Sequence, residues 1–335
     1  MQLRSESVLR AINNTEKKYN ILCTPCHERF SSNLASLPHT FYMLHKPGVT
    51  KPWVHHYAKL PDNHILIDFS EESLPKNTRF DIVLSQNKFG NFQIVAPLAQ
   101  QLNIPLVSLE HTLPVPTWTK KQIDLTTQMR GKVNMFISES SIEKWGFSKD
   151  DPSVRVLKHA IDSDKFKPVE NGHNDGRILS VVNDLINRDI FCGWNLYQRL
   201  TKGLPINPVG DTKGFSEPAK DTDDLISKYQ NASVFLNTSL VSPIPMSLLE
   251  AASVGAPIVS TNTCEIPYIF TDGIHGFFSN DEGYLRSKLI WCLENPAEAK
   301  KLGQSARQLI IERFNLKQHL DTWNEVFEEV IGQGY

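Results

Sequence analysis

The sequence has little that would tie it to a membrane, to nucleic acid or to an oxidising compartment. Its 335 residues contain no run of about 18 apolar residues, so no segment is expected to span a bilayer. The formal net charge is only −2, which gives no basic footprint for nucleic acid or for an acidic membrane surface. The five cysteines are scattered and odd in number, which favours a reducing compartment over a disulfide framework.

The first residues lack the pattern of an exported protein. The segment M-Q-L-R-S-E-S-V-L-R-A-I has neither an apolar core nor a cleavage site, so we expect no signal peptide. Residues 1–18 are predicted to form a polar helix or a loosely held extension. Together with the cysteine pattern, this predicts a cytoplasmic location.

No cluster of metal-ligand residues has a convincing spacing. Asp221, Asp223 and Asp224 stand at a predicted helix start, where carboxylates serve as N-terminal caps. Cys23 and Cys26 form a C-x-x-C pair without a second pair or a histidine tract, so zinc is not indicated. We therefore expect neither a metal nor another cofactor.

What the sequence does contain is the composition of a two-domain globular protein, 40% hydrophobic and 21% charged. The polar, glycine-containing stretch 169–176 is typical of a linker. We expect one domain over residues 1–168, a second over 169–315 and a final amphipathic helix within 316–335. Five apolar residues share one face of that helix: Leu320, Trp323, Val326, Phe327 and Val330.

Short apolar runs alternate with helical patterns along the chain. In the first domain the predicted strands cover 19–24, 40–44, 64–69, 80–85, 104–109, 133–138 and 154–157, with a helix over 92–102. In the second, predicted strands cover 178–182, 206–209, 233–236 and 257–260, with helices over 221–231, 282–293 and 296–313. This alternation predicts an α/β fold with parallel sheets.

The most informative stretch is 237–280, where a strand, a helix, a strand and a short helix follow one another. Ser242 precedes Pro243 and Pro245, which suits the N-cap and first turn of a helix, and Gly255 suits its end. Helix N-termini near Ser242 and Cys264 should face one crevice beyond the strand ends, a position suited to phosphate. Glu250 lies two turns into the first helix, where its carboxylate either accepts hydrogen bonds from a ribose diol or is simply solvated.

This stretch resembles the C-terminal half of retaining glycosyltransferases of the GT-B fold, especially glycosyltransferase family 4. The matching positions are Pro245, Leu249, Glu250, Ala251, Gly255, Pro257, Ile258, Val259, Thr261, Ile266, Pro267, Asp272, Gly273 and Gly276. The resemblance implies two facing Rossmann-like domains with a nucleotide-sugar donor in the cleft. The C-terminal domain would hold the nucleotide, the N-terminal domain would present the acceptor, and the last helix would cross back to the first domain.

The chain departs from the family pattern at several positions. Ser242 replaces a glutamate that touches the sugar in the family, and Cys264-Glu265 replace a glycine pair. The arginine and lysine that clamp the donor diphosphate fall on Asp184 and Asp189. We therefore expect Arg188 to take the diphosphate, because a guanidinium fork suits phosphate oxygens, with Lys202 as the reserve candidate.

The resemblance implies a role for each candidate residue. Glu250 would hold the ribose, Arg188 the diphosphate, and His111, at the end of a strand, would contact the sugar; a capped loop histidine is the other interpretation of His111. The donor-binding set is Asn183, Arg188, Gly210, Ser242, Pro243, Ile244, Glu250, Thr263 and Cys264. His27, Glu28 and Arg29 follow the first strand and are predicted either to contact the acceptor or to be polar residues of a helix start.

The function implied is transfer of a hexosyl or related sugar, with retention of configuration and without a metal, from a UDP- or GDP-sugar to an unidentified acceptor. Three further functions are compatible with the same residues. One is a nucleotide-sugar epimerase, which shares the two-domain fold. Another is a non-catalytic protein that binds a sugar nucleotide or a partner. The third is a sugar-binding protein with two α/β domains. The oligomeric state is open.

Overall fold

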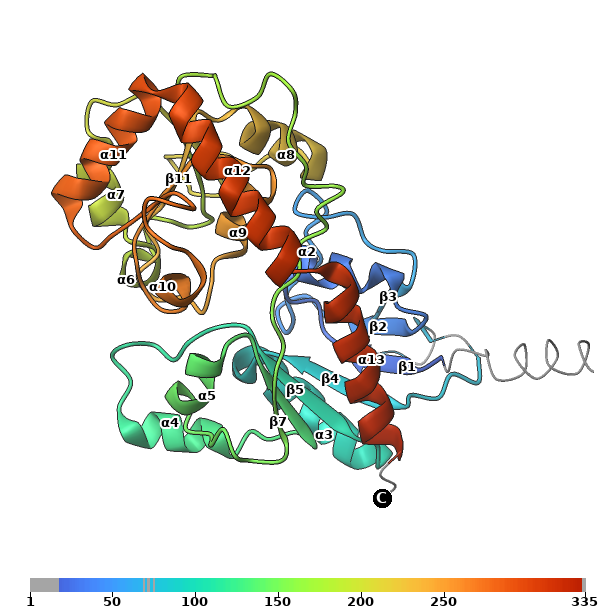
Figure 1. The fold of residues 1–335 in the computed structure, drawn as a ribbon. Helices are drawn as coiled ribbons and strands as arrows, with labels where there is room; N and C mark the ends of the chain where they lie inside the picture. The colour runs from blue at the N-terminus through green and yellow to red at the C-terminus, as the bar shows by residue number, and fades with distance from the viewer. Residues whose placement is uncertain (1–17, 69, 71–72, 75, 333–335) are drawn as a thin grey trace, which may run out of the picture.

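The computed structural model describes residues 18–332 apart from residues 69, 71–72 and 75. The extension predicted for residues 1–18 falls almost entirely outside these ranges. The described chain forms two α/β units that lie one above the other in Figure 1, each built on its own parallel sheet. Among the described residues, no helix is both long and apolar enough to cross a bilayer. The predicted α/β class with two parallel sheets is confirmed.

The N-terminal unit contains a seven-stranded parallel sheet within the described residues. In spatial order its strands are β3 (His64–Ile67), β2 (Thr40–Leu44), β1 (Asn20–Cys23), β4 (Ile82–Gln86), β5 (Leu106–Glu110), β6 (Val133–Phe136) and β7 (Val154–Val156). The central strands are buried along their length, as expected when helices cover both faces of a parallel sheet. The strand order reverses between β1 and β4.

The C-terminal unit contains a five-stranded parallel sheet within the described residues. In spatial order its strands are β12 (Phe277–Phe278), β11 (Ile258–Ser260), β10 (Val234–Asn237), β8 (Ile178–Val181) and β9 (Ile206–Val209). The two-residue strand β12 has too little sequence pattern to be predicted. Here the order reverses between β8 and β10, so each sheet has one switch point at which ligands bind in open α/β folds.

Helices connect the strands and cover the sheets. The N-terminal unit has η1 (Asn33–Ser36), η3 (Lys88–Phe92), α2 (Glu28–Ser32), α3 (Gln93–Leu102), α4 (Lys120–Thr127) and α5 (Glu139–Lys144). The C-terminal unit has α6 (Asp189–Cys192), α7 (Trp194–Thr201), α8 (Thr222–Asn231), α9 (Met246–Ser253), α10 (Ile266–Ile269), α11 (Glu282–Glu294) and α12 (Pro296–Arg313).

The start of α9 corrects one prediction. Ser242 does not cap the helix, which begins only at Met246 with Pro245 as its N-cap. The reason is steric, because a residue that precedes proline is pushed out of the helical region, and both Ser242 and Ile244 precede one. The end is as predicted: Gly255 follows the helix with a φ of 76°.

The last helix, α13 (Leu316–Gly332), packs against the N-terminal unit, as predicted (Figure 1). Trp323, Val326 and Phe327 are buried in the common core. The His319 imidazole donates from Nδ1 to the Lys158 carbonyl oxygen at 2.8 Å. The chain therefore crosses between the units twice, once before β8 and once between α12 and α13.

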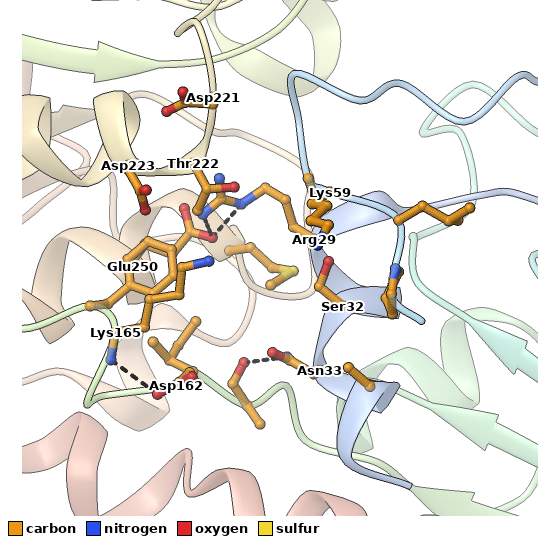
Figure 2. Close-up of a pocket in the computed structure, with 18 of the residues that line it drawn as sticks. Arg29, Ser32, Asn33, Lys59, Asp162, Lys165, Asp221, Thr222, Asp223 and Glu250 are labelled. Atoms are coloured by element: carbon orange, nitrogen blue, oxygen red, sulfur yellow. Dashed lines mark hydrogen bonds and ion pairs between the residues drawn. The ribbon is translucent and has the colours of Figure 1, made fainter. Parts of the chain in front are cut away.

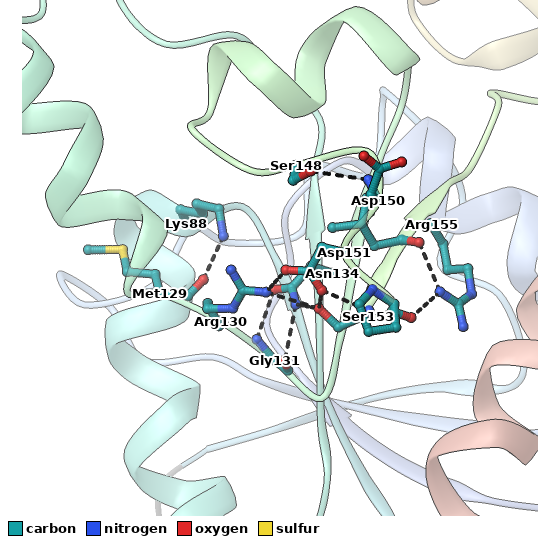
Figure 3. A network of polar contacts seen from close by, with 12 residues as sticks. Lys88, Met129, Arg130, Gly131, Asn134, Ser148, Asp150, Asp151, Ser153 and Arg155 are labelled. Carbon is teal, nitrogen blue, oxygen red and sulfur yellow. Dashed lines mark hydrogen bonds and ion pairs between the residues drawn. The ribbon is translucent and has the colours of Figure 1, made fainter.

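A polar network fixes the turn that leads into β6 (Figure 3). Asn134 accepts from the Gly131 backbone N–H at 3.0 Å and donates to the Gly131 carbonyl oxygen at 3.1 Å. Arg130 pairs with Asp151, and Lys88 donates from Nζ to the Met129 carbonyl oxygen at 2.5 Å. Because this turn precedes β6, it lies at the amino end of that strand, and the network is a structural feature of the N-terminal unit.

Candidate functional site

The ends of the two sheets face each other, and the loops that carry most of the predicted residues lie at these ends. Loops after β1 and β5 come from the N-terminal unit, and loops after β8, β10 and β11 come from the C-terminal unit. The units touch beside the cleft, where Thr222 Oγ1 donates to the Tyr57 carbonyl oxygen at 3.4 Å. A cavity of about 550 Å³, lined by Arg29, Lys59, Lys165, Thr222 and Glu250 among others, opens between them (Figure 2).

Glu250 lies on α9 at the edge of this cavity, with its side chain only 3% exposed. Its Oε1 accepts from Nε of Arg29 at 2.6 Å and also from Nη2 of that residue. Its Oε2 accepts from the Tyr229 hydroxyl at 2.9 Å. Burial raises the pKa of Glu250, an effect that Arg29 and then Tyr229 partly offset. The carboxylate is therefore not a solvated helix residue, and both of its oxygens are engaged.

Arg29 reaches this carboxylate from α2 of the N-terminal unit (Figure 2). Its guanidinium carbon lies 5.2 Å from the centre of the Phe166 ring, within range of a cation–π contact. Its Nη1 is buried and has no hydrogen-bond partner among the described residues. The sequence places Arg29 on the acceptor side, and the structure places it against the residue expected to bind the donor.

The two residues before Arg29 have different surroundings. His27 is exposed to the cleft. Desolvation of its ring by the surrounding protein, and then the positive charges of Lys51 and Arg188, lower the pKa of His27 to about 4. Glu28 is buried, and its Oε1 accepts from the Val54 backbone N–H at 3.1 Å. Of this pair, His27 is the one available to a ligand, whereas Glu28 holds the loop that follows β2.

His111 lies at the end of β5, directly behind His27. The two rings meet edge to face with centroids 4.5 Å apart, and Phe30 packs against His111 at 4.4 Å. His111 Nε2 is 3.3 Å from the Gln86 side-chain oxygen. Burial, and then the neighbouring His27 and other histidines, lower the pKa of His111 far below its usual range. It is therefore a neutral, largely buried imidazole that packs against the exposed His27 ring.

Arg188 lies on the opposite side of the cleft, at the start of α6. It is exposed, and its Nη1 donates to the Asn183 carbonyl oxygen at 3.3 Å. Its charge contributes to the lowered pKa of His27, which indicates that the guanidinium lies near the facing loop of the other unit. Asn183 Oδ1 in turn accepts from the Asp211 backbone N–H at 2.9 Å. Arg188 and Asn183 are thus neighbours at the start of α6.

Lys202, the reserve candidate for the diphosphate, lies outside the cleft. It follows the last residue of α7 and precedes β9. In α/β units helices run back against the strands, so Lys202 lies at the amino ends of the strands, away from the cleft. Asp184 and Asp189 occupy the family's clamp positions. Asp184 accepts a hydrogen bond from the Asn187 side-chain amide at 2.7 Å, and Asp189 accepts one from the Asn195 backbone N–H at 2.9 Å.

The loop after β9 approaches the loop after β8 closely. Gly210 has a φ of 134°, and a Cβ at this position would lie 2.1 Å from the Val182 carbonyl oxygen. Only glycine fits such an approach. Gly210 therefore shapes the backbone beside Asn183.

The loops after β10 and β11 lie together beside Glu250. Pro243 accepts through its carbonyl oxygen from the Glu265 backbone N–H at 3.3 Å, and Thr263 Oγ1 donates to the Ser239 carbonyl oxygen at 2.8 Å. Ser242 is partly exposed in this loop, whereas Ile244 is buried. Cys264 has a φ of 54°, so it adopts the left-handed conformation that glycine favours. Where the family pattern has a glycine pair, this chain has Cys264 and Glu265, and Cys264 keeps a left-handed backbone conformation.

Several residues of the cleft could not be found from sequence. Tyr229 has the spacing of an ordinary core residue on α8, and Phe166 that of a residue in a connecting segment. His159 and His319 join His111 around the Phe30 ring, although they are far apart in the chain. Within the described residues, no group of three or more His, Cys, Asp or Glu could hold a metal ion.

Comparison with known proteins matches residues 215–309 to the family described as glycosyl transferases group 1. This range contains Glu250 and the loops after β10 and β11. A trehalose synthase from Pyrococcus horikoshii is 23% identical over 108 residues, which are 32% of this chain and 26% of that protein. The match thus spans about a quarter of the length of this relative.

Solved structures match almost the whole chain. HepE from Anabaena in complex with UDP covers 93% of this chain and 100% of its own, with a TM-score of 0.69 and 12% identity. Sucrose-phosphate synthase from Thermosynechococcus elongatus covers 94% of this chain and 100% of its own, with a TM-score of 0.70 and 12% identity. The chain therefore has the GT-B fold, and its residues 215–309 match the family described as glycosyl transferases group 1.

Proposed function

We propose that this protein transfers a sugar from a nucleotide-sugar donor to the hydroxyl group of an acceptor, with retention of anomeric configuration. The observation that carries the proposal is the position of Glu250. It lies within the group 1 domain, on the helix between the two donor-side loops, at the edge of a cleft between two GT-B units. A carboxylate at this place can accept hydrogen bonds from the ribose diol.

The donor in this proposal is a UDP- or GDP-sugar. A structurally similar protein, HepE from Anabaena, has been solved with UDP and with UDP-glucose, which supports a uridine nucleotide as the first candidate. Arg188 and the loop 262–265 would receive the diphosphate. In this loop the Asn262 and Glu265 backbone N–H groups already donate to Asn280 Oδ1 and to the Pro243 carbonyl oxygen, which leaves those of Thr263 and Cys264 for the ligand.

The chemistry would depend on stabilising the leaving group. As the bond between the sugar and the diphosphate breaks, negative charge grows on the diphosphate oxygens, and fixed donors such as Arg188 lower the barrier. The acceptor hydroxyl would attack from the face that the diphosphate leaves, which retains the configuration. We assign the sugar contact to His111 and the acceptor side to the exposed His27, whose ring packs edge to face against that of His111. We propose that no metal is needed.

A second candidate function is a protein that binds a sugar nucleotide without transferring the sugar. Two observations favour it over an epimerase and over a protein that binds a free sugar. Ser242 carries no charge where the glycosyltransferase pattern has a glutamate. Arg29 donates a hydrogen bond to the Glu250 carboxylate, which a ribose would otherwise contact. These features weaken the donor site without removing it.

A thermal-shift and hydrolysis screen of UDP-, GDP-, ADP- and CMP-sugars, with and without EDTA, tests the proposal. We expect one nucleotide sugar to raise the melting temperature and to be slowly hydrolysed whether or not EDTA is present. Stabilisation without hydrolysis or transfer across an acceptor panel would support the binding protein. No stabilisation by any of the donors would contradict both functions.

A further inference from the structure

The carboxylate expected to hold the ribose already has partners on both oxygens. Oε1 of Glu250 takes two N–H groups of Arg29, and Oε2 takes the Tyr229 hydroxyl. The side chain is only 3% exposed, so there is no open approach for a ribose diol. One of the two partners must leave before a diol can bind in its place.

The structure indicates which partner can leave. Tyr229 is fully buried and lies on α8, in the same unit as Glu250, where its ring also packs against Phe235. Arg29 comes from the other unit and keeps 21% of its side chain exposed. Moving Tyr229 would require repacking of the core, whereas a small separation of the two units would withdraw Arg29 together with α2.

Arg29 makes a second contact with the C-terminal unit through Phe166. The carbonyl oxygen of Phe166 accepts from Ser253 Oγ at 2.7 Å and from Arg307 Nη1 at 3.0 Å, so this residue is bonded to α9 and α12. The guanidinium of Arg29 therefore contacts the C-terminal unit in two ways: through the Glu250 carboxylate and through the Phe166 ring, which is itself hydrogen-bonded to that unit. An exposed ion pair contributes little to stability. Because Glu250 is buried, loss of its partner would leave an uncompensated charge in the interior and would lower the stability of the protein.

We propose that Arg29 is an internal competitor of the nucleotide: it occupies the ribose position of Glu250 when no donor is bound and thereby holds the two units together. The inference rests on the proposed function, because it takes Glu250 as the ribose ligand. Binding of a nucleotide and the Arg29–Glu250 contact then exclude each other, so binding must offset the free energy of breaking the contact. By linkage, a change at Arg29 that weakens this contact strengthens nucleotide binding, by at most the free energy of the contact.

Calorimetric titration of UDP and GDP into the wild type and Arg29→Met tests the competition. We expect the variant to bind more tightly, by about tenfold, which is within the usual range of coupling between linked equilibria. Lys59→Met is the matched control, because Lys59 lines the same cavity but makes none of the three hydrogen bonds to Glu250, and its loss should not tighten binding. Unchanged affinity in Arg29→Met overturns the proposal. Weaker affinity also overturns it and makes Arg29 a phosphate ligand.

Small-angle scattering without nucleotide tests the contact independently of ligand binding. We expect a larger radius of gyration for Arg29→Met than for the wild type. Tyr229→Phe removes the other hydrogen bond to Glu250 but crosses no domain boundary, so its scattering should match the wild type. If Arg29→Met does not fold, Arg29→Lys keeps the charge without the two-pronged bond, and we expect changes of the same sign but smaller.

The two proposals fail in different ways. If neither the wild type nor the variant binds any nucleotide, the proposed function fails, and scattering alone decides whether Arg29 holds the units together. If nucleotides bind but the scattering and the affinity of the variant equal those of the wild type, the proposed function stands and the competition is refuted.

Discussion

Gly303 of α12 lies directly against Gly255, the residue that ends α9. A Cβ on Gly303 would lie 2.1 Å from the Gly255 carbonyl oxygen, far inside van der Waals contact. A side chain on Gly303 therefore has no room at this approach, whereas a Cβ on Gly255 would lie 3.8 Å from the Gly303 carbonyl oxygen, an ordinary contact. The contact fixes α12 against α9, and α9 carries Glu250.

We predict that Gly303→Ala destabilises the protein by about 1–3 kcal/mol, the usual cost of overpacking a buried contact. The measurement is urea unfolding followed by circular dichroism. Gly332→Ala serves as the control, because a Cβ at Gly332 would meet nothing within 4 Å. Equal midpoints for the two variants would contradict the close approach.

Glu250→Ala should affect both stability and binding. Removing this carboxylate leaves the Arg29 guanidinium and the Tyr229 hydroxyl without their acceptor, and loss of one partner of a buried pair costs about 3 kcal/mol. Nucleotide binding should be lost as well, measured by calorimetry at a temperature where the variant is folded. Glu282→Ala, which removes the exposed pair with Arg199, should change neither quantity. A stable variant with normal affinity would remove Glu250 from the site.

Arg188→Met should weaken nucleotide binding without changing the melting temperature. A charge-assisted hydrogen bond contributes about 1.5–3 kcal/mol, so we expect the Kd to rise by about 10- to 150-fold. Because Arg188 is exposed and its guanidinium donates to the Asn183 carbonyl oxygen at a long 3.3 Å, its loss should leave stability unchanged. Arg177→Met, an exposed arginine at the amino end of β8, is the matched control. Equal loss of affinity in both variants would indicate a general charge effect.

Buried histidines predict a loss of stability in acid. Burial lowers the pKa of His159 to about 3 and that of His319 to about 4, below the ordinary value of 6.5. Between pH 6.5 and 4 the unfolded chain therefore binds protons that the folded protein does not, so stability is complete above pH 6.5 and falls on acidification. Each such histidine removes about 1.4 kcal/mol per pH unit in this window.

The test is the pH dependence of the unfolding free energy in His159→Asn. We expect its slope between pH 6.5 and 4 to be smaller than in the wild type by one proton. His55→Asn, which replaces an exposed histidine, is the matched control. Parallel slopes for the wild type and His159→Asn would mean that His159 is protonated in the folded protein.

The order of elements could be predicted from the sequence because it depends on local periodicity. β2, β9 and α12 have the predicted limits, and most other predicted elements differ by one or two residues. The predicted start of α9 was wrong because two local effects of proline compete there. Pro243 and Pro245 suit a first helical turn, but each also excludes its preceding residue from the helix, so α9 starts at Met246. The helices α4, α5 and α7 were not predicted; each is only six to eight residues long.

The sequence by itself determined that Arg188 and His111 follow strand ends of a parallel α/β fold and that Glu250 lies on the helix after such a strand. Chain order and strand direction place the loops that follow parallel strands at one edge of their sheet. Which partner each side chain meets was decided only by the tertiary structure. Arg29 and Glu250 are 221 positions apart, and no pattern along the chain relates a helix of one unit to a helix of the other. Their contact exists because two sheets with reversed strand order face each other, and that packing also turned a predicted ribose ligand into one half of a buried ion pair.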